Sequence, residues 1–201
     1  MTLLFTSEGF YNKKIKETFK NLTSKFSNPK IAILALGSYK KNKNHFDKIM
    51  DNFFEMGYTE SNIEFINLNA YAAKNLINFD VLYLDGGNPY QILSMYKNKT
   101  VDKIISKMHN DGKLIMGISG SAIVLCPTLE LMNDFIPQFN KNYLDSYEAL
   151  NLVDFEFFPH YGRSDELFGT KEEIDKKIHD FQIRTTIKVL TLTDDEFFVV
   201  E

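Results

Sequence analysis

The stretch Lys113-Leu-Ile-Met-Gly-Ile-Ser-Gly-Ser-Ala-Ile-Val-Leu-Cys-Pro127 places a serine between two apolar runs. This pattern predicts a strand over 113–118, a tight turn at Ser119, and a helix directly after the turn. Such a turn holds the serine backbone in a strained conformation and lifts its hydroxyl out of the sheet edge. The first N–H groups of the helix have no intrahelical partner and can receive an oxyanion. Ser119 is therefore a candidate nucleophile.

The turn departs at one position from the nucleophile pattern Gly-x-Ser-x-Gly. Gly117, Ser119 and Gly120 fit this pattern, but Ser121 stands where the last glycine belongs. The spacing from Gly117 argues against Ser121 as the nucleophile itself. A glycine-serine turn also serves as a plain strand–helix connection, so the remainder of the chain decides between the two interpretations.

Apolar runs and amphipathic stretches alternate along most of the chain. The expected strands are 3–6, 30–36, 63–68, 81–84, 113–118, 152–158, 188–193 and 196–200. The expected helices are 7–26 with Ser7 as its cap, 44–56, 70–76, 89–96, 101–110 and 171–184. This order predicts a mostly parallel sheet with helices on both faces, a three-layer α/β/α sandwich. The short 193–196 turn predicts a terminal hairpin.

Composition fits a single domain over residues 1–201. The chain is 44% hydrophobic with a formal charge of −4, so no nucleic-acid or membrane partner is expected. Its one cysteine, Cys126, excludes an intrachain disulfide and agrees with a reducing compartment. With no visible signal peptide or membrane span, we expect a cytoplasmic protein. The sequence leaves monomer and homodimer open.

Three unusual segments fall at the carboxyl ends of expected strands, where open α/β sheets bind their ligands. They are Asp85-Gly-Gly-Asn88, the Ser119 turn, and Phe158-Pro-His-Tyr161. The backbone N–H of Gly87 could donate to an oxyanion opposite Ser119. The segment lacks the glycine patterns of nucleotide-binding loops, and no His/Cys/Asp cluster has metal-ligand spacing, so neither cofactor nor metal is expected.

A serine nucleophile needs a base and an acid that orients the base. Of four histidines, His160 follows an apolar strand that would deliver it to the sheet edge. Asp134 lies in an otherwise apolar stretch, and Asp194 and Asp195 lie at the terminal turn. Each of these acids could instead form a cap or a turn.

These motifs together resemble the serine peptidases that include aspartyl dipeptidase (dipeptidase E) and cyanophycinase. The resemblance runs in matching order over roughly residues 30–201. The matching segments are Tyr83–Asn88 with Gln91, Gly117–Ser119 followed by 125–128, Asn133-Asp134, Pro159-His160, and 192–195 followed by 197–200. The family fold is a three-layer sandwich related to class I glutamine amidotransferases, with serine in place of cysteine at the turn.

By this resemblance Ser119 is the nucleophile and His160 its base, with Asp134 as the sequence-matched third member of the triad. Asp194 or Asp195 competes for that role, because in some relatives an acid at the hairpin holds the histidine. Gly87 and Gly120 would form the oxyanion hole. Asn88 and Arg163 would bind the substrate, with Arg163 as the cation for an aspartyl carboxylate.

The resemblance implies a hydrolase, a serine peptidase acting on small peptides, with aspartyl dipeptides as candidate substrates. A non-catalytic ligand-binding protein on the same fold stays open, because the turn reads Ser119-Gly120-Ser121 where the family has Ser-Ala-Gly. An esterase using the same triad is a third hypothesis.

Overall fold

The computed structural model describes residues 2–36, 42–67, 73–141, 144–163 and 167–201. Its centre is a six-stranded sheet in the order β3-β2-β4-β5-β1-β8. The strands are β1 (Thr2–Thr6), β2 (Ile31–Leu34), β3 (Ile63–Ile66), β4 (Val81–Leu84), β5 (Leu114–Ile118) and β8 (Phe197–Val200). Five strands are parallel, and β8 runs antiparallel to β1 at one edge. The predicted mostly parallel sheet is confirmed.

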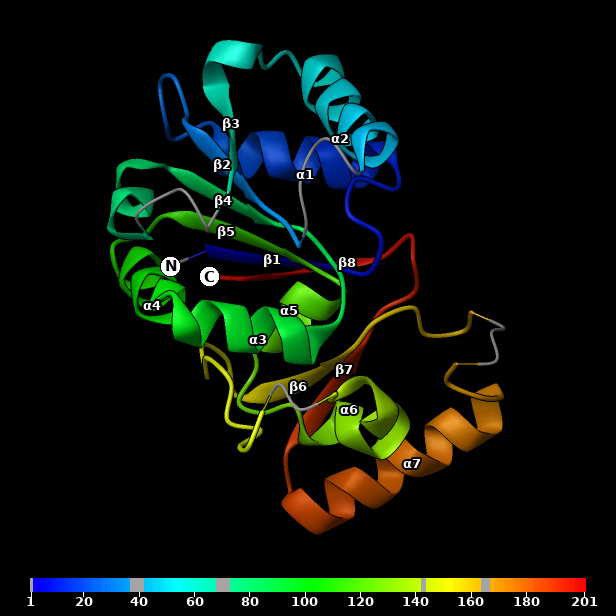
Figure 1. The fold of residues 1–201 in the computed structure, drawn as a ribbon. Helices are drawn as coiled ribbons and strands as arrows, with labels where there is room; N and C mark the ends of the chain where they lie inside the picture. Colours follow the sequence, from blue (N-terminus) through cyan, green and yellow to red (C-terminus); the bar gives the residue numbers. More distant parts are fainter. Residues whose placement is uncertain (1, 37–41, 68–72, 142–143, 164–166) are drawn as a thin grey trace.

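Helices cover both faces of this sheet (Figure 1). On one face lie α1 (Lys13–Thr23) and α2 (Lys43–Glu55), and on the other α3 (Pro89–Asn98), α4 (Val101–Asn110) and α5 (Gly120–Val124). Neighbouring strand residues face opposite layers, so Tyr83 packs with α1 and α2 while Leu82 and Leu84 pack with α3 and α4. The predicted three-layer α/β/α sandwich is confirmed.

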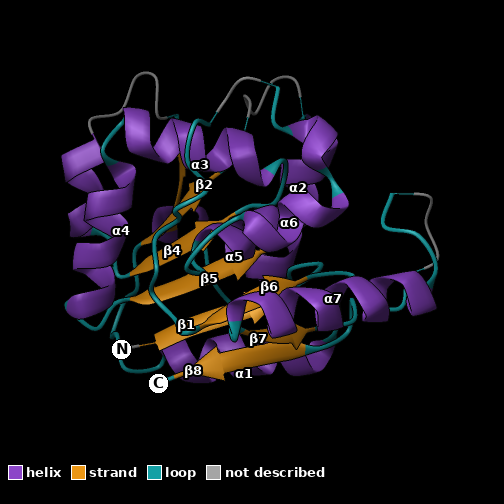
Figure 2. Ribbon diagram, turned by 90° about the horizontal axis from the view of Figure 1, so that it is seen from below, coloured by secondary structure: helices purple, strands orange, loops and turns teal. Residues whose placement is uncertain are grey.

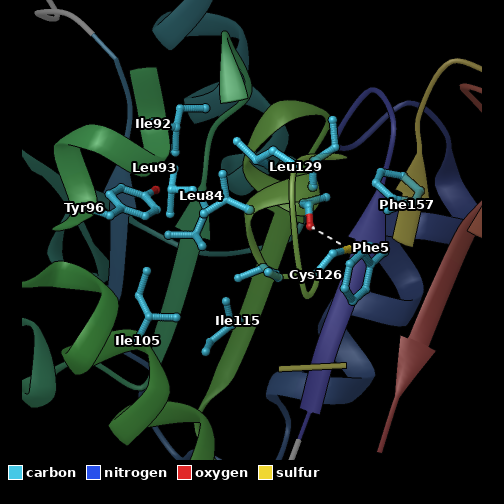
Figure 3. Close-up of a cluster of buried hydrophobic side chains, with 14 of the residues drawn as sticks. Phe5, Leu84, Ile92, Leu93, Tyr96, Ile105, Ile115, Cys126, Leu129 and Phe157 are labelled. Carbon is cyan, nitrogen blue, oxygen red and sulfur yellow. Dashed lines mark hydrogen bonds between the residues drawn. The ribbon is translucent and has the colours of Figure 1, made fainter. Parts of the chain in front are cut away.

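A cluster of buried apolar side chains fills the core beneath α3 and α4 (Figure 3), and it includes residues of α5, the helix that follows Ser119. Phe5, Leu84 and Ile115 from three adjacent strands are fully buried there, together with Tyr96 from α3. Cys126 is also fully buried, and its thiol donates to the Ala122 carbonyl at 3.7 Å. Burial raises the pKa of this thiol well above its usual value, so Cys126 packs as an apolar side chain.

A second, smaller sheet lies beyond the sandwich and was not predicted. Its strands β6 (Phe155–Phe158) and β7 (Lys188–Thr191) are parallel, and α7 (Lys171–Thr185) connects them (Figure 2). The helix α6 (Glu130–Phe135) packs on α7. Three short 3-10 helices complete the described elements: η1 (Glu60–Asn62), η2 (Ala73–Asn78) and η3 (Pro137–Phe139).

Two sequence-based expectations are corrected. The predicted terminal hairpin is wrong, because β7 pairs with β6 and β8 pairs with β1, so only the turn between them is retained. The helix predicted to start at Ser7 begins at Lys13 with Asn12 as its cap, because Gly9 at φ 66° first turns the chain across the strand ends. The predicted helix over 70–76 lies partly outside the described residues.

Within the described ranges, no helix combines the length and apolar character needed to cross a membrane.

Candidate active site

Ser119 lies between the last residue of β5 and the first residue of α5. Its backbone has φ 48° and ψ −118°, a conformation uncommon for a residue other than glycine. A Cβ atom at Gly117 would lie 2.8 Å from Ala122 Cα, so only glycine lets the helix return this closely over the strand. The predicted strained turn is confirmed.

Gly120 and Ser121, the two unusual residues after Ser119, both lie against the loop that follows β4. A Cβ atom at Gly120 would lie 1.9 Å from the Gly87 carbonyl oxygen, so the absence of a side chain leaves room for that loop. Ser121 is fully buried, and its hydroxyl donates to the Asp85 carbonyl in the same loop at 2.5 Å. Gly120 therefore leaves room for the loop that follows β4, and Ser121 binds this loop through a hydrogen bond. Since the Ser121 hydroxyl is used there, the geometry favours Ser119 as the nucleophile.

His160 comes from the second sheet, two residues beyond β6. Its Nε2 lies 3.0 Å from the Ser119 hydroxyl, a hydrogen-bonding distance for a base and its nucleophile. The backbone N–H of His160 donates to the Ser7 hydroxyl at 3.0 Å, and this hydroxyl donates to the Leu192 carbonyl at 2.9 Å. Ser7 follows β1, so it connects the two sheets directly behind the histidine.

Of the three acids that the sequence offers, Asp194 reaches His160, with Oδ1 2.6 Å from the imidazole Nδ1, and Glu8 lies farther from this nitrogen at 3.7 Å. Burial raises the pKa of Asp194, but hydrogen bonds from His160 and Arg163 outweigh this effect and lower it. An ionised carboxylate can only accept hydrogen bonds, so Nδ1 carries a proton and Nε2 is left to accept one from Ser119. The parallel register of β6 and β7 explains the contact, because residues just beyond both strand ends lie side by side.

The other two candidate acids have different partners. Asp134 on α6 accepts a hydrogen bond from Arg184 of α7 at 2.8 Å. Of the candidate acids, the structure therefore brings Asp194, and not the sequence-matched Asp134, to His160. The cause is packing: α6 lies against α7, whereas the chain beyond β7 runs beside His160. Asp195 accepts from the Thr193 hydroxyl at 2.6 Å and stabilises the turn.

Arg163 lies in the site, and its guanidinium already binds two carboxylates. Its Nη2 lies 2.7 Å from Asp194 and 2.8 Å from Glu8, and its Nε donates to Asp194 at 3.0 Å. Burial lowers the pKa of Arg163, but the hydrogen bonds to Asp194 and Glu8 outweigh this and raise it, so the group stays charged. Arg163 thus holds the acid behind His160.

Two cavities meet at Ser119 and His160. The first, of about 460 Å³, is also lined by the predicted oxyanion residues Gly87 and Gly120 and by Asn88. The side chain of Asn88 caps α3 through Tyr90 N–H at 3.0 Å and donates to the Phe139 carbonyl at 2.9 Å, so it shapes the cavity wall. A direct contact between Asn88 and substrate stays a prediction.

The second cavity, of about 360 Å³, lies toward α2 and has a polar lining. It includes Glu8 and His45, which the sequence did not single out, and Asp85, whose Oδ2 lies 2.9 Å from His45 Nε2. Burial raises the pKa of Asp85, although the hydrogen bond from His45 lowers it. Ser7 and Glu8 could have been found, because they follow the first strand at the same sheet edge as Ser119.

Within the described ranges, Glu8, His160 and Asp194 place potential metal-ligand atoms within 4.8 Å of one another. The guanidinium of Arg163 bridges the two carboxylates of this group, which supplies the positive charge that a metal ion would bring. We therefore interpret these residues as the candidate base, His160, and the charged side chains around it, and not as a metal site.

Comparisons with known proteins show what the chain is similar to. The family described as Peptidase family S51 matches residues 3–201. An uncharacterized peptidase from Listeria innocua serovar 6a is 34% identical over 91 residues, 45% of this chain and 44% of that protein. Peptidase E from a Nostoc species is 26% identical over 156 residues, 77% of this chain and 61% of that protein. The matched segments thus span less than two thirds of either relative.

A solved structure confirms the fold. The crystal structure of a candidate Peptidase E protein from Listeria monocytogenes EGD-e superimposes with a TM-score of 0.76. The match covers 99% of this chain and 93% of that one at 21% sequence identity. At this identity the likeness establishes the shared architecture alone.

Proposed function

Because the chain belongs to peptidase family S51, we propose that it is a serine-type peptidase that hydrolyses amide bonds of small peptides. The family and the relatives named Peptidase E support a hydrolase of this class. The observation that carries the proposal is the continuous chain from Ser119 through His160 to Asp194, with contacts of 3.0 and 2.6 Å.

In the proposed reaction, Ser119 Oγ attacks the peptide carbonyl carbon while His160 Nε2 takes the hydroxyl proton. Asp194 stabilises the imidazolium that forms, and Arg163 keeps Asp194 ionised and oriented. The backbone N–H groups of Gly87 and Gly120 are the proposed donors to the oxyanion. The C–N bond then breaks, and His160 gives its proton to the departing amine.

Water completes the cycle on the acyl-enzyme. His160 removes a proton from the water, the hydroxide attacks the ester carbon, and the proton returns to Ser119 as the acid product leaves. These steps need no group beyond the residues named, water and the peptide.

Aspartyl dipeptides are a narrower candidate substrate class, which the resemblance implies. A substrate carboxylate needs a cation, and among the described residues the lysine and arginine side chains that line the first cavity are Arg163 and Lys141. Since Arg163 already binds Asp194 and Glu8, aspartyl recognition would depend on Lys141.

The test is an assay in which the purified protein hydrolyses a set of small peptides and the released amine is measured. We expect turnover that is lost in both Ser119→Ala and His160→Ala. Ser94→Ala and His179→Ala, on α3 and α7, are matched controls and should keep it. Loss in the controls as well, or turnover in Ser119→Ala, would contradict the assignment.

The non-catalytic alternative rested on Ser121, and the hydrogen bond from Ser121 to Asp85 gives this residue a place compatible with an active turn. An esterase would use the same atoms, so matched amide and ester substrates separate it from a peptidase. A cytoplasmic location and a monomer or homodimer remain part of the proposal as the sequence predicts them.

A further inference from the structure

The cavity beside Ser119 has a largely apolar wall built from four segments. Six side chains form it: Ile123, Met132, Ile136, Phe139, Leu167 and Phe168. They come from α5, α6 with its C-terminal end, η3, and the loop before α7. The ring of Phe168 packs on Phe158 at 5.2 Å and on Phe135 at 6.2 Å, which fixes this part of the wall against the core.

The polar groups of the same cavity are largely engaged within the protein. Arg163 binds Asp194 and Glu8, and Asn88 caps α3 and binds the Phe139 carbonyl. Among the described residues of the lining, the other lysine or arginine is Lys141, which is exposed to solvent. A substrate carboxylate that entered this cavity would lose its hydration and would gain no buried cationic partner among the described residues. Such desolvation is unfavourable.

The second cavity offers no better place for a substrate acid. It already contains the carboxylates of Glu8 and Asp85, His45 is held by Asp85, and the side chain of Lys48 is exposed to solvent. Since His45 binds Asp85, an added carboxylate would meet like charge close by. Among the described residues, neither space flanking Ser119 offers a buried and unengaged cation to an acidic side chain.

We infer that the apolar cavity binds the side chain of a residue next to the scissile bond, and that this enzyme prefers apolar residues there over aspartate. The inference rests on the proposed peptidase function. Ser119, His160 and both oxyanion glycines line this same cavity, so a side chain within it lies next to the reacting carbonyl. Its volume of about 460 Å³ is in the range of small-ligand pockets, about 300–1,000 Å³.

The test compares leucine, asparagine and aspartate, which share a branched γ position and differ mainly in polarity and charge. Two series of dipeptides, X-Ala and Ala-X, place the variable residue on either side of the scissile bond. We expect kcat/KM to favour leucine over aspartate by about 10- to 100-fold in one series, with asparagine between them, from the burial of one apolar side chain. The series that shows the effect identifies the side.

A charge introduced into the wall should change this ratio. Leu167 is 39% exposed, so Leu167→Lys should fold, and it should lower the leucine-to-aspartate ratio about 10-fold through a new cation. Phe54→Lys on α2, at 42% exposure, is the matched control and should leave the ratio unchanged. A second wall variant, Phe139→Lys, should act in the same direction as Leu167→Lys.

Labelling of Ser119 with a fluorophosphonate separates failure of the inference from failure of the function. If the protein is labelled but aspartate equals or exceeds leucine in both series, or no dipeptide is cleaved, the inference is overturned and the activated serine stands. A ratio that Leu167→Lys and Phe139→Lys leave unchanged also overturns it. If the folded protein is not labelled, the proposed function falls, and the inference falls with it.

Discussion

The two halves of the candidate triad are encoded differently. Ser119 lies in a turn formed by one continuous segment, because Gly117 lets the chain fold back closely onto Ala122 at the start of α5. His160 and Asp194 lie 34 positions apart in the sequence and meet only because β6 and β7 pair in parallel. The candidate nucleophile is thus placed by local sequence, whereas the candidate base and its acid are placed by long-range strand pairing.

The nucleophile half should be sensitive to added volume. Gly120→Ala places a methyl group where the Gly87 carbonyl lies, so the loop must move and carry the Gly87 N–H with it. We expect kcat/KM for peptide hydrolysis to fall by about 10²- to 10³-fold, the usual effect of a lost oxyanion donor. Gly57→Ala has no atom within 4 Å of the new Cβ and should leave kcat/KM unchanged, although its φ of 92° will lower stability.

The half that contains His160 and Asp194 should depend on the hydrogen bonds that fix the position of His160. Ser7→Ala removes the acceptor of the His160 N–H and the donor to Leu192, so the histidine loses its fixed position. We expect kcat/KM to fall about 10-fold and the free energy of unfolding to fall by about 1–3 kcal/mol. Steady-state kinetics and denaturant unfolding measure the two effects. Ser24→Ala at the exposed end of α1 is the control. Equal losses in both variants would contradict a specific role of Ser7 in positioning His160.

The smallest effect on activity is expected at Glu156, which is fully buried on β6. Burial raises its pKa to about 7, although hydrogen bonds from Thr128 lower it. The folded state therefore holds a proton that the unfolded chain has lost, and stability should fall as pH rises from about 4.5 to about 7.

Glu156→Gln removes this charge and can keep the Thr128 contacts at 2.8 and 2.9 Å. Denaturant unfolding should show little difference from wild type at pH 4.5 and a gain of about 1–3 kcal/mol at pH 8. Peptide hydrolysis should be almost unchanged. A stability difference that does not vary with pH would contradict a buried, protonated Glu156.

Sequence reasoning succeeded where the structure is local. The turn at Ser119 and the alternation of strands and helices follow from patterns within about 20 residues. It left the acid open between Asp134, Asp194 and Asp195, because these residues look alike until the partner of β7 is known. The false terminal hairpin has the same origin: the short turn at 193–196 is real, but the two strands that it joins pair in different sheets.

The most direct test of the two-sheet triad is the rate of fluorophosphonate labelling, with the modified residue identified by mass spectrometry. The proteins to compare are wild type, Asp194→Asn and Asp134→Asn. We predict that the label is found on Ser119, that Asp194→Asn slows labelling by about 10³- to 10⁴-fold, and that Asp134→Asn stays close to wild type. The account would be contradicted by a label on Ser121, or by slow labelling of Asp134→Asn together with a wild-type labelling rate for Asp194→Asn.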